Sequence, residues 1–246
     1  MIKKTVWITC VTLLLVTSVG WAAISRLQQA EVTELWQPEP PVVVAEQGQV
    51  PSDAIVLLGE DLSAWRHGSG DPAQWHMDEG VATVKAGTGD IFTKDSFESV
   101  QLHVEWRSPT EIEGEGQGRG NSGVFLMQHY EVQVLDSYQN PTYANGQAAS
   151  VYKQHIPLVN ASRSPGEWQS YDIIFMAPVF DSAGRIRRPA TLTVLHNGVL
   201  VQNNVSVQGP TEFIGEPNYD AHGPLPIKLQ DHSNPVSYRN IWVRRL

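Results

Sequence analysis

The apolar and polar residues of this chain change their spacing near residue 53. An uncharged, mostly apolar run covers residues 6–23. From residue 53 onward, short apolar-rich segments alternate with turn residues, and residues 97–106 alternate apolar and polar positions over their second half, as a half-buried strand does. No later segment repeats its apolar residues with a helical period over three turns. The pattern predicts many short strands and few helices.

Other strands are expected where β-branched and aromatic residues gather between turn residues. Two strands within residues 123–135 break near Gln128. The pair Asn197-Gly198 predicts a tight hairpin turn, because both of its central residues must take positive φ. The other expected strands cover residues 54–58, 168–175, 190–195, 199–202, 225–230 and 236–243. This distribution favours an all-β sandwich or barrel.

Three parts are expected along the chain. Residues 1–23 have two lysines before the apolar run and small residues around Trp21, which predicts a cleaved signal peptide or, since the run has 18 residues, a retained membrane anchor. Residues 24–52 contain Pro38-Glu-Pro-Pro41 and are expected to form a flexible, extended linker. Residues 53–246 form the folded domain. We therefore expect an exported protein, periplasmic or extracellular, that contacts a membrane only if the anchor is retained.

Charge and cysteine content exclude several kinds of partner and chemistry. The net charge is -9, and the sequence has no basic patch, so nucleic acid is not an expected partner. The single cysteine, Cys10, lies inside the apolar run. The folded domain therefore has no disulfide, no thiol nucleophile and no cysteine-bound metal.

A glycine-rich loop and the strand after it form the first candidate site. Arg119 and Asn121 lie in the loop, and Glu131 and Gln133 lie in the strand. Residues two apart in a strand share a face, so Glu131 and Gln133 project together while the valines beside them face the opposite way. Such a polar pair lies either in a cleft or on a solvated outer face. The neighbouring loop favours the cleft.

Residues 151–163 form the second candidate segment. They are polar, aromatic and long for a sandwich connection, and they include Lys153 and Arg163. Long ordered loops tend to be functional, but the two side chains would also suit an ordinary solvated loop. The sequence leaves these alternatives open.

The third candidate segment lies near the C-terminus. Strand alternation turns Lys228 and Gln230 away from the core. Asp231 and His232 follow, and they suggest an acid–base or metal-binding pair. Aspartate is also common at the start of a turn, which is the simpler interpretation of Asp231.

The sequence lacks the motifs of several enzyme classes. It has no Gly-x-Ser-x-Gly elbow, phosphate-binding loop, dinucleotide fingerprint or His-Glu-x-x-His helix. A sandwich glucanase would place two or more acids at alternate positions of one strand, a spacing compatible with paired carboxylates. Here the neighbour of Glu131 on that face is Gln133, which cannot ionise. This pairing argues against an ordinary retaining glycosidase.

Five motifs in order resemble the 3-keto-disaccharide hydrolase domain family, from about Ile55 to Val243. The resemblance implies a two-sheet antiparallel jelly-roll sandwich of the concanavalin type. It also implies hydrolysis of glycosides whose sugar carries a ketone at C3. The motifs are RGNSGVF (119–125), YEVQVLDS (130–137), GEWQSYDII (166–174), HNG (196–198) and LQDH with YRNI (229–232 and 238–241).

A C3 ketone acidifies the proton on C2, so a single base suffices. The base gives an enolate, the anomeric group leaves by β-elimination, and water then adds. Residue chemistry suggests Glu131 or His232 as the base, and Arg119, Lys153 or a divalent metal ion as the group that stabilises the enolate. Other polar side chains are expected to hold sugar hydroxyls: Asn121, Gln133, Gln230 and Arg163.

The alternative function is a non-catalytic carbohydrate-binding module, because jelly rolls serve both roles. An aromatic platform for a sugar is available from Trp65, Trp75, Tyr130, Tyr152 and Trp168. A third alternative is an interaction domain held at the cell surface by the linker. The enzyme needs at least one ionisable group with a shifted pKa, whereas a binding module needs none. Carbohydrate is the expected partner of the first two.

Overall fold

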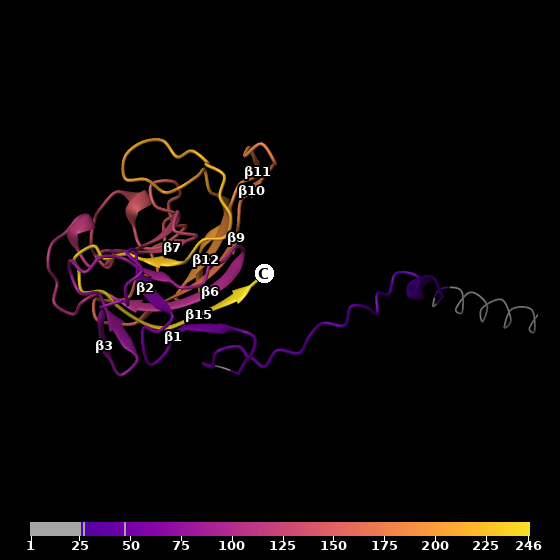
Figure 1. Cartoon of the computed structure of the whole chain (residues 1–246), viewed down its shortest axis with the longest axis horizontal. Helices are drawn as coiled ribbons and strands as arrows, with labels where there is room; N and C mark the ends of the chain where they lie inside the picture. Colours follow the sequence, from indigo (N-terminus) through magenta and orange to yellow (C-terminus); the bar gives the residue numbers. More distant parts are fainter. Residues whose placement is uncertain (1–25, 27, 47) are drawn as a thin grey trace, which may run out of the picture. The chain divides into compact units, whose positions relative to one another are not determined.

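The structure is a computed structural model that describes residues 26, 28–46 and 48–246 (Figure 1). The expected signal or anchor over residues 1–23 lies outside these residues. In the linker, residues 28–31 form a turn of helix, where an extended chain was expected. Glutamine, alanine and glutamate favour helix, and no proline precedes Pro38. Of the described residues, none belongs to a helix long and apolar enough to cross a membrane.

Residues Val44–Leu246 form one compact unit, and its regular secondary structure is almost entirely β-strand. Two short 3₁₀ turns, η1 (Gly116–Gly118) and η2 (Ala144–Gly146), interrupt the strands. The strands are β1 (Ile55–Leu58), β2 (Trp65–His67), β3 (His76–Asp78), β4 (Val81–Thr83), β5 (Ile91–Thr93), β6 (Val100–Arg107), β7 (Ser122–Leu126), β8 (Tyr130–Val134), β9 (Gln169–Met176), β10 (Val179–Phe180), β11 (Ile186–Arg188), β12 (Thr191–His196), β13 (Val199–Ser206), β14 (Lys228–Leu229) and β15 (Ser237–Arg245).

Within the described residues these strands form two antiparallel sheets and a hairpin. The larger sheet has eight strands in the order β13-β12-β9-β6-β15-β4-β3, with β1 beside β15. The smaller sheet has five strands in the order β2-β5-β14-β7-β8, and β10 pairs with β11. Figure 1 shows β7 and β14 lying across from β6, β9 and β15.

Inward-facing residues of both sheets meet in one hydrophobic core. In β6 every second residue is buried, as the alternation predicts. Polar contacts also join the sheets: the hydroxyl of Tyr171 on β9 donates to the carbonyl of Gln133 on β8 at 2.8 Å. The hydroxyl of Tyr238 on β15 donates to Ser122 Oγ on β7 at 2.7 Å. The expected all-β, two-sheet antiparallel sandwich is confirmed.

Backbone conformation at the turns follows the sequence pattern in two places. Asn197 and Gly198 have φ of 53° and 78°, and they join β12 to β13 as the expected hairpin. β7 and β8 break at Met127 and Gln128, both with positive φ. The strand expected over residues 225–230 is shorter, because β14 contains only Lys228–Leu229. Pro226 within the expected strand lacks the N–H that sheet pairing needs, which limits the length of the strand.

Candidate active site

Three adjacent strands of the smaller sheet place side chains in one row on the face opposite the core. Glu131 of β8 is paired with Phe125 of β7, and Phe125 is paired with Lys228 of β14. The row forms part of a pocket of about 260 Å³. The residues lining the pocket are Asn121, Phe125, Glu131, Gln133, Tyr152, Thr211, Phe213, Lys228, Gln230 and His232.

Both backbone polar groups of Glu131 are bonded at the free edge of β8. Its N–H donates to Thr211 Oγ1 at 3.2 Å, and its carbonyl accepts from the Tyr152 N–H at 3.3 Å. The segment around Tyr152 and the loop that carries Thr211 both bond to this edge, which does not pair with β7. The polar face of β8 is therefore covered rather than solvated, and only 5% of Glu131 is exposed.

This burial changes the chemistry of the carboxyl group. Removal from water disfavours the charged form and raises the pKa of Glu131 to about 8. The positive charge of Lys228 acts in the opposite direction, and the negative charge of Asp90 adds to the increase. A carboxyl group with this pKa takes up and releases a proton near neutral pH, which suits a general acid or base.

Gln133 lies beside Glu131, and its amide can be placed in two orientations of the same shape. With the nitrogen turned toward Glu131, the amide donates to Glu131 Oε1 at 2.7 Å and to the Ser122 carbonyl at 3.2 Å. The opposite orientation leaves the amide oxygen facing only acceptors. When Glu131 is ionised its carboxylate can only accept, and Gln133 is then the donor that orients it.

Gly123 makes room for this carboxyl group. A Cβ atom at residue 123 would lie 2.5 Å from Glu131 Oε1 and 2.7 Å from Cε2 of Phe125. No side chain other than hydrogen fits there unless Glu131 or Phe125 moves. The glycine therefore sets how closely the carboxyl group approaches the sheet.

Lys228 provides the positive charge of the pocket. Its Nζ lies 3.6 Å from the centroid of the Phe125 ring and 3.4 Å from Oδ2 of Asp90. Its side chain is largely buried, so the interactions with the ring and the carboxylate are only weakly screened by water. Phe125 lies between Lys228 and Glu131 in this row, so the acid and the cation are on opposite sides of the Phe125 ring.

The remaining predicted residues of this pocket lie along its rim. The Gln230 N–H donates to the Gly123 carbonyl at 3.1 Å, and the Gln230 carbonyl accepts from Ser122 Oγ at 2.6 Å. Asn121 is buried, and its Nδ2 donates to the Gln117 carbonyl at 2.7 Å. His232 is exposed. The structure therefore brings five predicted residues together: Asn121, Glu131, Gln133, Gln230 and His232.

Asp231 follows the simpler interpretation and opens a turn. Its Oδ2 accepts from the Gly89 N–H and its Oδ1 from the Ser233 N–H, both at 2.9 Å. These bonds use the carboxylate to fix the backbone on which His232 lies. Asp231 thus orders the loop rather than pairing with the histidine.

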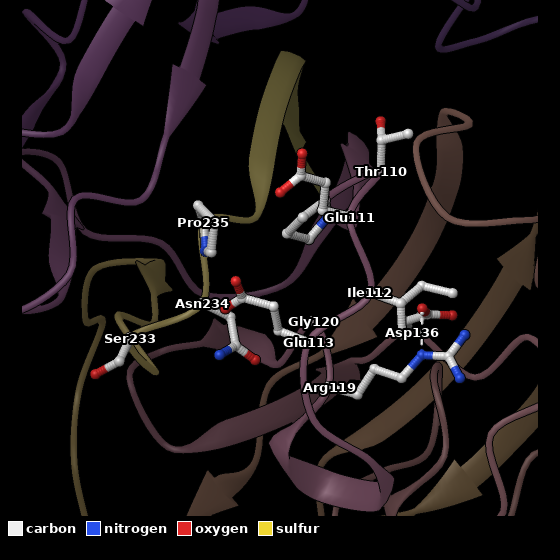
Figure 2. Close-up of a pocket in the computed structure, with 11 residues that line it drawn as sticks. Thr110, Glu111, Ile112, Glu113, Arg119, Gly120, Asp136, Ser233, Asn234 and Pro235 are labelled. Atoms are coloured by element: carbon white, nitrogen blue, oxygen red, sulfur yellow. Dashed lines mark hydrogen bonds and ion pairs between the residues drawn. The ribbon is translucent and has the colours of Figure 1, made fainter.

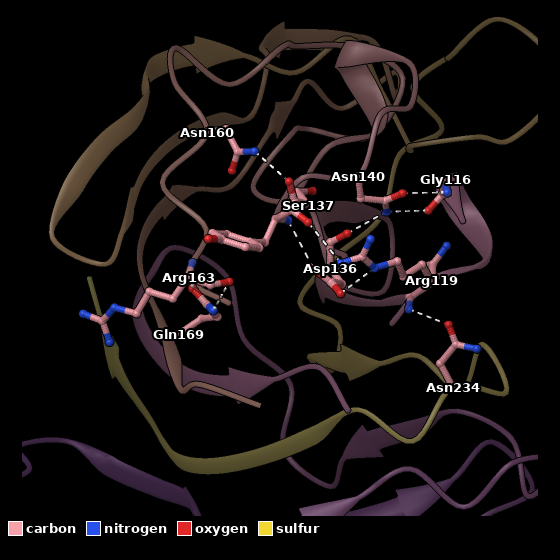
Figure 3. Close-up of polar contacts among 11 residues, drawn as sticks. Gly116, Arg119, Asp136, Ser137, Asn140, Asn160, Arg163, Gln169 and Asn234 are labelled. Carbon is pink, nitrogen blue, oxygen red and sulfur yellow. Dashed lines mark hydrogen bonds and ion pairs between the residues drawn. The ribbon is translucent and has the colours of Figure 1, made fainter. Parts of the chain in front are cut away.

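Arg119 and Arg163 are not among the residues that line the pocket, and Figure 3 shows the polar contacts around them. Arg119 Nε donates to Oδ2 of Asp136 at 2.7 Å, and its Nη2 donates to the Tyr138 carbonyl at 3.0 Å. Arg163 Nη1 donates to the Trp168 carbonyl at 2.8 Å. Both guanidinium groups hold neighbouring loops, so their predicted contacts with the sugar are not supported by this placement.

Arg119 instead lines a second pocket, of about 310 Å³ (Figure 2). Glu111, Glu113 and Asn234 also border it. Asn234 Oδ1 accepts from the Asn121 N–H at 2.7 Å, and this bond separates the two pockets. The buried acid here, Asp136, is neutralised by Arg119. The pocket around Glu131, whose acid has a shifted pKa, is therefore the candidate active site.

Several lining residues were not predicted as site residues. Lys228 could have been found from its position, because strand alternation had already turned it away from the core. Tyr152 was considered only as a sugar platform. Thr211 and Phe213 lie in the irregular loop between β13 and β14, where no periodicity marks them.

The divalent metal ion considered as an enolate stabiliser stays a prediction. Among the described residues, no group of three or more histidine, cysteine, aspartate or glutamate side chains is arranged to hold a metal ion. The pocket lining offers Glu131 and His232 as donors of this kind. These two do not make up the three protein ligands usual for a catalytic zinc, so no step is assigned to a metal.

Comparison with known proteins agrees with the fold. Residues 53–244 match the 3-keto-alpha-glucoside-1,2-lyase-like domain. The chain belongs to this family. The family resemblance drawn from the five motifs is therefore confirmed.

Solved structures of related proteins extend this result. A Parabacteroides distasonis ATCC 8503 protein, described as a "putative glycosyl hydrolase", is 52% identical, with a TM-score of 0.85 over 88% of this chain and 96% of that one. A second protein of that organism with the same description is 18% identical, with a TM-score of 0.59 over 79% and 94% of the two chains, and it shows the fold alone. No curated protein matches the chain. These findings support a protein that acts on glycosides, without defining the type of glycoside.

Proposed function

We propose that this protein cleaves glycosides whose sugar carries a ketone at C3, with Glu131 as the general base. The observation that carries the proposal is the buried Glu131 carboxyl group, whose pKa is raised to about 8. Glu131 is also the one carboxylate among the described residues that line the pocket. A mechanism with one base fits this lining, and a mechanism with paired carboxylates does not.

The first step is removal of the C2 proton by the Glu131 carboxylate. The C–H electrons form the C2=C3 double bond, and the C3 oxygen becomes an enolate. Lys228 replaces Arg119 and Lys153 as the proposed cation, because its ammonium lies in the pocket on the other side of Phe125. Electrostatic stabilisation of a developing oxyanion is usually the largest single contribution to the rate enhancement of an enzyme.

The second step expels the anomeric group. The enolate electrons return to form the C1=C2 double bond, the C3 carbonyl is restored, and the bond between C1 and the leaving oxygen breaks. His232 at the rim donates a proton to that oxygen. Water then adds across C1=C2, with its proton at C2 and its hydroxyl at C1, and net hydrolysis results. Without the water step, the unsaturated keto sugar is the product, as the lyase in the family's description suggests.

The test is incubation of the protein with a 3-keto-disaccharide, with the released sugar and any unsaturated product followed by chromatography and mass spectrometry. We expect release by the wild type and loss of release in Glu131→Gln. Glu98→Gln serves as the matched control, because Glu98 is exposed and lies far along the chain from the pocket lining. No turnover by the wild type, with or without added divalent metal, would rule out the enzyme.

A carbohydrate-binding module is the second candidate function. Tyr152 and Phe213 border the pocket and offer ring faces on which a sugar can stack. A binding module does not need a carboxyl group titrating near neutral pH, however, and a buried ionisable group lowers stability when it is charged. Binding of the 3-keto-disaccharide without turnover would favour this candidate.

A further inference from the structure

The pocket around Glu131 is too small to enclose a whole glycoside. Its volume is about 260 Å³, below the roughly 300–1,000 Å³ of pockets that enclose drug-sized ligands. One sugar ring therefore fills it, and the group attached to the anomeric oxygen must extend across the mouth. The side chains at the mouth then decide which leaving groups are accepted.

Aromatic rings gather at this mouth. Phe213 lines the pocket although 70% of it is exposed. Tyr152 also lines the pocket, and its hydroxyl is 2.7 Å from the hydroxyl of Tyr143, which is 37% exposed. Phe213 and Tyr143 thus expose ring surface beside the pocket, where a bound ligand can cover it. The rings of Tyr143 and Tyr152 are inclined at 57° to each other, so each ring offers its own face for stacking just outside the site of the reaction.

Lys153 adds a positive charge to the same surface. Its Nζ lies 4.4 Å from the ring centroid of Tyr143, 5.4 Å from that of Phe213 and 6.0 Å from that of Tyr152. In the described part of the chain, no carboxylate lies within ion-pairing distance of this ammonium. The protein as a whole has a net charge of -9. A cation without an acidic partner is thus held at the mouth by aromatic contacts.

The backbone fixes Lys153 in an unusual conformation. Its φ is 63°, in the left-handed region that lysine rarely adopts. The Lys153 N–H donates to the Asn145 carbonyl at 2.8 Å, and Asn145 Nδ2 donates to the Lys153 carbonyl at 3.1 Å. Observed backbone strain of this kind supports a functional hypothesis when a site adjoins it. Here the conformation directs the lysine toward the rings.

We propose that Phe213, Tyr143, Tyr152 and Lys153 form a subsite for the leaving group, specific for a flat aryl group that carries a carboxylate. The rings supply the stacking face, and Lys153 supplies the countercharge. This inference rests on the proposed function for the orientation of the sugar, with its anomeric carbon toward the mouth. It names the class of glycoside that the pocket accepts.

The test measures binding of glucosides that have no ketone, so that no reaction is involved. Calorimetric titration compares methyl, phenyl and 4-carboxyphenyl glucosides of both anomers. The phenyl compound is expected to bind roughly 2- to 10-fold more tightly than the methyl compound, as a stacking contact allows. The carboxylate is expected to add about 2- to 5-fold at low ionic strength, and this gain is expected to fall in high salt.

Variants separate the two contributions. Phe213→Ala is expected to remove most of the phenyl preference, and Lys153→Met the carboxylate preference alone. Ile214→Ala and Lys85→Met are the controls, because both residues are exposed and neither lines the pocket. Both controls should keep both preferences.

Three results would overturn the subsite. These are equal binding of the methyl and phenyl compounds, a carboxylate preference that survives Lys153→Met, and no saturable binding of the carboxyphenyl compound at its solubility limit. A plain glucose disaccharide that binds as tightly as the carboxyphenyl glucoside would assign the surface to a second sugar instead. Failure of the proposed function gives a different result: the aryl preference persists, but 3-keto-glycosides are not turned over.

Discussion

Gly123 and Glu131 are sterically matched across β7 and β8, because the carboxyl oxygen of Glu131 occupies the space that a Cβ atom of residue 123 would need. The catalytic proposal therefore depends on a residue that has no chemistry of its own. The close contact at Gly123 also makes the geometry of the pocket sensitive to the addition of a single methyl group.

Gly123→Ala should displace Glu131 or Phe125 from its present position. Overpacking of this kind costs about 1–3 kcal/mol in stability, and kcat should fall because the base is misplaced. Urea unfolding and turnover of a 3-keto-disaccharide measure the two effects. Gly118→Ala is the control, because a Cβ there meets no atom within 4 Å. Equal activity in both variants would show that the carboxyl position is not critical.

Glu131→Gln should lower kcat by about 10²–10⁴-fold, the usual contribution of a general base. The wild-type kcat/KM should rise tenfold per pH unit and level off near pH 8, because the base works only when ionised and its pKa is about 8. A pH profile from about pH 5 to about pH 10 measures this. A flat profile would exclude Glu131 as the base.

The same carboxyl group should make stability depend on pH. Its pKa rises from 4.5 to about 8 on folding, so the folded state holds the proton more tightly than the unfolded state. This contribution is fully present below pH 4.5 and is lost as the pH rises to about 8, a change of roughly 5 kcal/mol. Glu131→Gln does not titrate, so its stability relative to the wild type should increase across this window. Urea unfolding at both ends tests the sign, and Glu98→Gln should show no such change.

Lys228 and Asp90 should move the pH profile in opposite directions. Lys228 lowers the pKa of Glu131 and Asp90 raises it. Lys228→Met should therefore shift the acidic limb of kcat/KM to higher pH and lower the plateau, because the enolate loses its cation. Asp90→Asn should shift that limb to lower pH. Shifts in the same direction would contradict this electrostatic arrangement.

Arg119→Met should affect stability rather than substrate binding. Only 3% of the Asp136 side chain is exposed, and removal of Arg119 leaves its charge buried without a partner. Breaking such a pair costs about 3–5 kcal/mol. Urea unfolding and KM should be measured together. A raised KM with unchanged stability would restore Arg119 as a residue that binds the sugar.

Strand patterns predicted the part of the fold that depends on local alternation. The inward residues of β6 and the Asn197-Gly198 turn followed from residue type alone. The same rule placed Glu131 and Gln133 on one face. It did not show that this face is covered, because the cover comes from residues 149–152 and from Thr211, whose positions depend on long-range contacts.

Charged residues show the same limit. Arg119, Lys153 and Lys228 have equally suitable side chains for the stabilisation of an enolate. Arg119 is engaged by Asp136, Lys153 lies at the mouth, and Lys228 lies inside the pocket. The difference is set by the partners that folding brings near each cation. The spacing of residues along the sequence does not predict which partners folding brings near each cation.

The order of strands in the smaller sheet has a consequence for the timing of assembly. β14 lies between β5 and β7, so residues near 228 must insert between residues near 91 and residues near 124. Pairings this distant in sequence form slowly and cannot form before the later partner has been synthesised. Lys228, Glu131 and Phe125 therefore come together only when most of the chain has been synthesised. A nascent chain that ends before Lys228 has no functional pocket.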